Sequence, residues 1–220
     1  MEATRNEHKK RTFKDTGTWV NRRHRSFNCP ASARSRTRRH GARAVCREGY
    51  LDGAQLIVGD ARDEQVLRNA VAGQDVVISA LGTAASPFRE VTLLSDATRA
   101  LVSAMKAEGV SRLICITGLG AGDSAGHGGF LFDKVIFPLL LRKVYSDKNR
   151  QEAIVRSSGL DWVLVRPSVL NNKPGRGTTR ALTDLSTFHG GTIAREDVAH
   201  FVLDQAHSNA WLHRAPLISW

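Results

Sequence analysis

Small and polar residues directly follow three apolar runs in this sequence. The first run ends in Gly59-Asp60, the second leads into Ser79–Thr83, and the third ends at Thr117, before a glycine-rich loop. A carboxylate can accept hydrogen bonds from an adenine or a sugar, and residues with little side chain let a diphosphate lie close to the backbone. Gly59-Asp60 alone is better explained as a turn in which Asp60 caps a helix, but two successive run ends of this kind favour a nucleotide site.

A threonine and a lysine are the candidates for catalysis. Thr117 would place a hydroxyl near a reacting carbonyl or a nicotinamide, and Lys148 would donate hydrogen bonds to the hydroxyls of a nicotinamide ribose. Each residue has a simpler alternative. The glycines after Thr117 would only permit positive φ in a loop, and Lys148 would form a surface pair with Glu152, four residues further on. Composition alone favours the surface pair.

A further apolar run carries the sequence VRPSVL, Val165–Leu170. Pro167 fixes the backbone there, and Ser168 and Val169 would contact the nicotinamide; the alternative is a rigid turn without a ligand. No histidines or cysteines have the spacing of metal ligands, so we predict no metal site. The candidate cofactor contacts are Asp60, Ala61, Ala80, Leu81, Gly82, Thr117, Lys148, Pro167, Ser168 and Val169.

These residues need a scaffold, and apolar runs that alternate with amphipathic segments supply one. We predict strands at Ala54–Asp60, Asp75–Thr83, Ser111–Gly118 and Asp161–Leu170, and helices at Asp63–Gly73, Glu90–Val110, Ser146–Leu160 and Ala194–Ala206. Ser146 or Asp147 would cap the third helix. Strands that are apolar throughout indicate a parallel sheet covered on both faces. The fold class is therefore α/β, a doubly wound parallel sheet with its ligand site at the carboxyl ends of the strands.

Charge is distributed unevenly along the 220 residues, which suit one domain. Residues 1–47 hold 14 basic and 3 acidic side chains, whereas residues 48–220 hold 18 of each. The three cysteines have no CxxC spacing, and the longest apolar run, Val135–Leu141, is too short to cross a bilayer. We expect a soluble, cytoplasmic protein with no membrane partner.

Four blocks in the same order resemble one known family. They are GDARDEQVLRNAVAGQDVVISALGT, RLICITGLGAGDS, DKNRQEAIVRSSGLDWVLVRPSVL and REDVAHFVLDQ. They look like the atypical short-chain dehydrogenases with an NmrA-like NAD(P)H-binding domain, in particular the biliverdin reductase B/flavin reductase group. The resemblance covers about Ala44–Gln205. It implies a Rossmann-like fold, NADP(H) as cofactor with NAD as the second choice, and reduction of a flavin, a quinone or a small carbonyl compound.

The resemblance also implies site residues. Among the candidates above, it places Asp60, Leu81, Gly82, Thr117, Lys148, Pro167 and Val169 along the cofactor. It adds Arg47, whose guanidinium would meet the adenosine 2′-phosphate. Tyr145 and Lys148 are spaced Y-x-x-K and not Y-x-x-x-K as in the catalytic dehydrogenases, so we do not expect Tyr145 to act as an acid. A small-molecule substrate is implied as the second partner.

The largest departure from the family is the missing glycine loop. No G-x-x-G-x-x-G occurs before Ala54, so we expect the first strand, glycine loop and helix to be missing or disrupted. Read one nucleotide later with free codon choice, Lys14–Gly41 can spell that strand, loop and helix. We favour the interpretation that residues 14–42 are an out-of-frame translation; the alternative is a genuine basic, disordered arm.

One basic segment, one domain and three possible functions follow from these observations. Residues 1–43 form a basic N-terminal segment, and residues 44–220 form the NAD(P)-binding domain. The function we favour is an NADPH-dependent reductase. The alternatives are a non-catalytic NADP-sensing regulator and a nucleic-acid binder that uses the basic arm, which the few aromatic residues among its arginines disfavour. Without the glycine loop we expect weak affinity for NADPH. The oligomeric state stays open.

Overall fold

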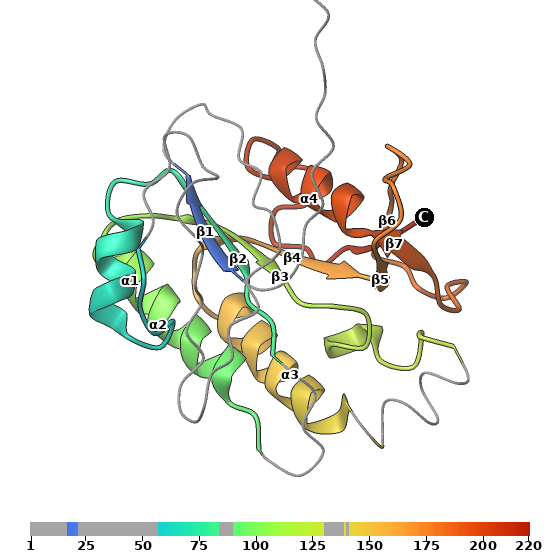
Figure 1. Ribbon diagram of the computed structural model, residues 1–220, viewed down its shortest axis with the longest axis horizontal. Coiled ribbons are helices and arrows are strands. Elements are labelled where there is room, and N and C mark those ends of the chain that lie inside the picture. Colours follow the sequence, from blue (N-terminus) through green and yellow to red (C-terminus); the bar gives the residue numbers. More distant parts are fainter. Residues whose placement is uncertain (1–16, 22–56, 84–89, 130–138, 140) are drawn as a thin grey trace, which may run out of the picture.

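A mainly parallel six-stranded sheet with helices on both faces forms the body of the protein (Figure 1). This computed structural model describes residues 17–21, 57–83, 90–129, 139 and 141–220. The sheet has the order β1-β2-β3-β4-β8-β6, with strands at Gly17–Asn21, Val76–Ala80, Arg112–Ile116, Asp161–Pro167, Leu217–Ser219 and Arg180–Leu182. A second sheet pairs β5, Val169–Asn171, with β7, Thr192–Ala194.

Helices α1, α2 and α3 cover one face of the sheet and α4 covers the other (Figure 1). They span Glu64–Val71, Leu93–Ala107, Arg142–Arg156 and Arg195–Asp204, and a short 3₁₀ helix, η1, spans Gly122–Ser124. Strands β2, β3, β4 and β8 run parallel, whereas the two edge strands β1 and β6 run antiparallel to their neighbours. The predicted doubly wound α/β fold is therefore confirmed, with antiparallel strands added at both edges.

The alternation of side chains along the central strands divides the core into two layers. Val77, Leu113 and Leu164 pack with the buried faces of α1, α2 and α3, and Ile114 and Val163 pack under α4. Because successive side chains of a strand point to opposite faces, an apolar run with no polar gap is what a sheet buried on both sides requires. All these strands direct their carboxyl ends to one edge of the sheet.

Two predicted elements were placed wrongly. Residues 57–60 are in no strand, and Ile57 and Val58 are 39% and 50% exposed. An apolar run stays in a sheet only where a neighbouring strand takes up its backbone groups, and no described strand pairs with residues 57–60; residues 54–56 lie outside the described part. Helix α3 begins at Arg142 rather than at Ser146, so neither Ser146 nor Asp147 is its cap.

The edge strand β1 occupies a place where the sequence indicated no regular element. Its first residue, Gly17, lies opposite Ala80, and its last, Asn21, lies opposite Val76. The chain therefore leaves β1 at the amino end of β2, away from the edge where the carboxyl ends of the parallel strands meet. The remainder of residues 1–43 lies outside the described residues. The frame-shift interpretation concerns the codons of residues 14–42 and stays a prediction. No helix in the described part of the chain is long and apolar enough to cross a membrane.

Candidate functional site

The candidate site lies where β3 ends and faces the first half of α3. Thr117 follows the last residue of β3 and is buried, and its carbonyl oxygen accepts a hydrogen bond from the Lys148 ammonium. A Cβ atom placed on Gly118 would lie 3.6 Å from Lys148 Nζ and 3.7 Å from the Tyr145 hydroxyl oxygen. Residues i and i+3 share a helix face, so α3 brings Tyr145 and Lys148 to one glycine.

Glu152 is not the surface partner of Lys148 that composition favoured. Its side chain is buried, and Oε1 accepts hydrogen bonds from the Thr117 hydroxyl at 2.8 Å and from Arg166 Nε at 2.9 Å. Arg166 Nη2 donates to Oε2 at 2.6 Å. The surface-pair alternative is therefore wrong, because both Lys148 and Glu152 turn toward the end of β3.

The glycine-rich loop after β3 is fixed to this network. Arg166 Nη2 lies 2.5 Å from Asp123 in η1, and the amide of Gly122 donates to Asn149 Oδ1 at 2.8 Å. Gly122 has φ +55°, and a Cβ there would come within 2.4 Å of Arg166 Nη2 and 2.7 Å of Glu152 Oε2. This position therefore needs glycine, both for its backbone and for the close approach.

The surroundings of Lys148 and Tyr145, both on α3, shift the pKa values of the two side chains. Burial lowers the pKa of Lys148 below its ordinary 10.5, and the nearby Glu152 carboxylate opposes that shift. Burial raises the pKa of the Tyr145 hydroxyl to about 12. Lys148 is therefore easier to deprotonate than a surface lysine, whereas Tyr145 keeps its proton. Burial also raises the pKa of Cys115 to about 12, which fits an inert core thiol.

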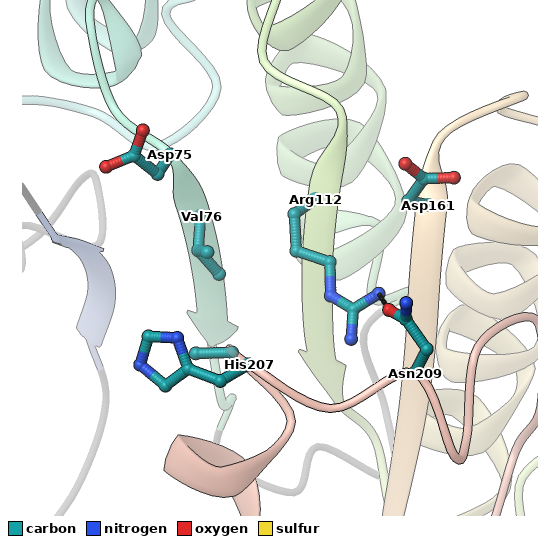
Figure 2. Close-up of a pocket in the computed structure, with 7 residues that line it drawn as sticks. Asp75, Val76, Arg112, Asp161, His207 and Asn209 are labelled. Carbon is teal, nitrogen blue, oxygen red and sulfur yellow. Dashed lines mark hydrogen bonds between the residues drawn. The ribbon is translucent and has the colours of Figure 1, made fainter. Parts of the chain in front are cut away.

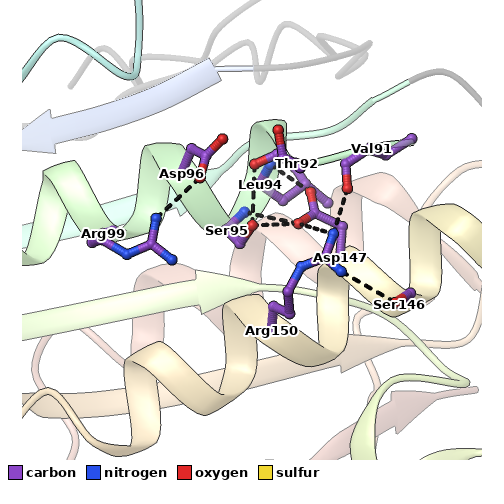
Figure 3. A network of polar contacts seen from close by, with 9 residues as sticks. All are labelled: Val91, Thr92, Leu94, Ser95, Asp96, Arg99, Ser146, Asp147 and Arg150. Carbon is purple, nitrogen blue, oxygen red and sulfur yellow. Dashed lines mark hydrogen bonds and ion pairs between the residues drawn. The ribbon is translucent and has the colours of Figure 1, made fainter. Parts of the chain in front are cut away.

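Asp147, one residue before Lys148, joins α3 to the start of α2 (Figure 3). Its fully buried carboxylate accepts hydrogen bonds from the amides of Leu94 at 2.8 Å and Ser95 at 3.3 Å, and from the Ser95 hydroxyl at 2.5 Å. Arg150 adds a contact at 3.3 Å to the same carboxylate. Asp147 thus caps a helix other than its own, and this contact fixes the turn of α3 that carries Lys148.

The remaining candidates differ in how far they are available to a ligand. Ala80, Leu81 and Gly82 are half-buried at the end of β2. At the end of β4, Pro167 and Ser168 are buried, and the Ser168 hydroxyl is bonded to Ser219 at 3.0 Å. Val169 is 49% exposed. Arg47 lies outside the described residues.

Asp60 already has a partner. Arg62 donates to both of its oxygens, at 3.0 and 2.6 Å, and these hydrogen bonds hold the pKa of Asp60 below its usual range. Ala61 is half-buried beside them, and it is Asp63 that caps α1. Gly59 is packed against α1, since a Cβ there would lie 2.5 Å from Val66. An adenine would have to share Asp60 with Arg62.

A hollow of about 420 Å³ at the opposite edge of the sheet is a poor alternative site (Figure 2). It lies at the amino ends of β2, β3 and β4, beside Asp75, Arg112 and Asp161. The Arg112 guanidinium is already committed to Asn209 at 3.2 Å, to the Gln205 carbonyl at 2.6 Å and to the Ser208 carbonyl. Arg112 therefore ties down the chain after α4 rather than facing a ligand.

At the carboxyl edge of the sheet, sequence reasoning missed the roles of three charged residues, Asp123, Asp147 and Arg166. One signal was present, because Lys148 and Glu152 are four apart and so share a helix face. Within the described residues, no three His, Cys, Asp or Glu side chains are grouped so that they could hold a metal ion. The site is instead a backbone edge with small residues, one ammonium and one phenol.

These residues fit the nicotinamide end of a dinucleotide. Gly118 has no side chain to separate its backbone from Lys148 and Tyr145, and the Lys148 ammonium has three N–H groups, one of which is donated to the Thr117 carbonyl. The fold and this edge define the class as a Rossmann-like dinucleotide-binding domain. A model of the NAD(P)H-binding family matches residues 32–209, so the chain belongs to that family. The resemblance and the cofactor class expected from the sequence are thereby confirmed.

Individual relatives share this fold. The uncharacterized sugar epimerase YhfK of Bacillus subtilis strain 168 is 32% identical over 155 residues, which are 69% of this chain. The match spans 66% of YhfK, just under two thirds of its length. The anaerobillin reductase ChuY of Escherichia coli O157:H7 superimposes with a TM-score of 0.63 and 25% identity, over 76% of this chain and 75% of ChuY. A short-chain dehydrogenase/reductase of Veillonella parvula DSM 2008 in complex with NADP gives 0.60 and 16%, over 74% and 70%.

Proposed function

We propose that this protein is an NAD(P)H-dependent reductase that passes a hydride to a flavin, a quinone or a small carbonyl compound. The observation that carries the proposal is the meeting of the Lys148 ammonium and the Tyr145 hydroxyl at Gly118, beside the buried Thr117. When bound, reduced nicotinamide supplies the hydride. Lys148 has N–H groups left after its bond to Thr117, and these would hold the ribose hydroxyls.

The named activity of ChuY supports a reductase, whereas the name of YhfK points to an epimerase. A reductase consumes NADPH in proportion to its acceptor, while an epimerase returns its cofactor unchanged. We expect oxidation of millimolar NADPH that depends on FMN, a simple quinone or a small aldehyde. Lys148→Met should lower kcat/KM by about a hundredfold, and Lys106→Met, at an exposed lysine of α2, should not. Absence of acceptor-dependent oxidation would refute the reductase.

A Tyr145→Phe variant can distinguish between the classes of hydride acceptor. Reduction of a carbonyl to an alcohol consumes one hydride and one proton, and the proton needs a donor at the oxygen as it gains charge. A flavin or a quinone can take its proton from solvent. If carbonyls are the substrates, Tyr145→Phe should lower their turnover by about a hundredfold. If flavins or quinones are the substrates, the same variant should keep nearly full activity.

A further inference from the structure

The carboxylate of Glu152 lies between Thr117 and Arg166 and contacts hydrogen-bond donors on each side. Oε1 accepts from the Thr117 hydroxyl and from Arg166 Nε, and Oε2 accepts from Arg166 Nη2. Glu152 is 2% exposed and Arg166 is 1% exposed. Water cannot replace a broken contact at such a depth, so the hydrogen bond from Thr117 is costly to break.

The direction of that hydrogen bond decides what Thr117 can offer to a ligand. A hydroxyl has one hydrogen and two lone pairs, whereas an ionised carboxylate accepts only. Arg166 is always protonated and donates only, and it donates to both oxygens of Glu152. The hydroxyl hydrogen of Thr117 is therefore donated to Glu152. A polar ligand group that meets the Thr117 oxygen must itself carry an N–H or O–H.

Lys148 restrains the backbone of Thr117, whose side chain Glu152 already holds. Its ammonium binds the carbonyl oxygen of Thr117, while Glu152, one turn later, binds the hydroxyl. The backbone and the side chain of Thr117 are thus both held from α3, and Gly118, which follows, has no side chain to stand between its backbone and the Lys148 and Tyr145 side chains. Rotation of the hydroxyl toward a ligand would break the bond to a buried charge.

We infer that Glu152 is a positioning residue that makes Thr117 an acceptor for the carboxamide NH₂ group of a nicotinamide. The inference rests on the proposed function, because it requires the nicotinamide to lie at the end of β3. At that end of the cofactor the carboxamide NH₂ is the N–H donor, and an acceptor oxygen fixed in place selects for it. Thr117 then orients the cofactor and does not give a proton to the substrate.

The test compares two ligands that differ only in this group. In 3-acetylpyridine adenine dinucleotide phosphate, a methyl group replaces the NH₂ of the carboxamide, so nothing remains to donate. The affinities of NADP⁺ and of this analogue are measured by titration for the wild type, Thr117→Val, Thr117→Ser and Glu152→Gln. Thr117→Val removes the oxygen at nearly constant shape, and Thr117→Ser keeps it, which makes the pair a matched control.

We expect the wild type and Thr117→Ser to bind NADP⁺ about tenfold more tightly than the analogue. Thr117→Val should bind both alike, because the acceptor is gone. Glu152→Gln should lower the ratio several-fold, because the hydroxyl can then donate; a purely structural defect would weaken both ligands equally. If Glu152→Gln does not fold, the threonine pair still decides the question.

The outcomes separate this inference from the proposed function. An unchanged ratio in Thr117→Val, with NADP⁺ still bound, would overturn only the inference. An equal loss of both ligands in Thr117→Val would also overturn it, since the oxygen would then serve another group, such as the ribose. Failure of every variant to bind NADP⁺, together with failure to oxidise NADPH, would overturn both.

Discussion

Lys148 and Glu152 lie one turn apart on α3 and hold two different oxygen atoms of the same residue, Thr117. The ammonium binds the carbonyl and the carboxylate binds the hydroxyl. Two opposite charges on one helix face commonly pair with each other at a surface. Here each charged group instead forms a hydrogen bond with Thr117 at the end of β3. The strand end is therefore fixed where a ligand of this fold class binds.

Tyr145 is expected to keep its proton far into the alkaline range. Burial raises the pKa of its hydroxyl from 10.0 to about 12, and Tyr50 is the only other tyrosine. In a Tyr50→Phe variant, absorbance of tyrosinate should therefore be absent near pH 10 while the protein is folded. The folded state then holds a proton that the unfolded state has lost, so stability should fall from about pH 10 to about pH 12. A midpoint near 10.0 in the folded variant would show that Tyr145 is solvated.

Lys148 should set the alkaline limb of the pH–rate profile. Burial lowers its pKa below 10.5, so a reaction that needs the ammonium should decline at a lower pH than an ordinary lysine would give. Glu152 opposes this shift by attraction. Glu152→Gln should therefore move the limb to still lower pH, measured as kcat/KM for NADPH. A limb that stays in place would mean that another group titrates there.

Asp147 caps the start of α2, and this buried contact should stabilise the protein far more than the exposed ion pair between Asp96 and Arg99 on α2. Asp147→Ala leaves the amides of Leu94 and Ser95 without their acceptor, and we expect a loss of about 3 kcal/mol in the free energy of unfolding. Asp96→Ala, which removes the exposed pair with Arg99 (Figure 3), should cost less than about 1 kcal/mol. Urea denaturation measures both. Equal losses would contradict the cap.

Two glycines of the loop after β3 separate backbone strain from close packing. Gly122 and Gly126 have φ values of +55° and +85°, but only a Cβ at Gly122 would meet Arg166 and Glu152. Gly126→Ala should cost about 1 kcal/mol for the backbone alone. Gly122→Ala should cost about 3 kcal/mol, because the buried ion pair must also shift. Thermal unfolding of the two variants checks the difference.

The coding sequence for residues 10–50 tests the frame-shift interpretation. We expect a single inserted or missing base to separate it from an open frame that encodes G-x-x-G-x-x-G. Restoring that frame should strengthen NADPH binding by more than tenfold, because a glycine loop supplies amides to the diphosphate. A stop codon in the shifted frame, or the lack of its glycines, would make the basic segment genuine.

The alternation of apolar runs and amphipathic segments determined most of the fold. A run such as residues 76–78 or 113–116 has no polar gap, so a sheet covered on both faces is the arrangement that buries it. The same pattern failed at Ile57 and Val58, because an apolar run says nothing about whether a neighbouring strand is present. It also could not give the direction of the edge strands β1 and β6, which depends on pairing between distant segments.

For the site, the family resemblance carried by the sequence placed Thr117 and Lys148 along one cofactor, whereas composition alone favoured a surface pair for Lys148. Only the tertiary structure showed that Glu152 is buried and hydrogen-bonded to Thr117 and Arg166. It also showed that Asp147 caps α2 rather than its own helix. The reason is physical. Periodicity fixes the face of a helix on which a charge stands, but the partner of a buried charge is set by which distant donors the packing brings within hydrogen-bond distance.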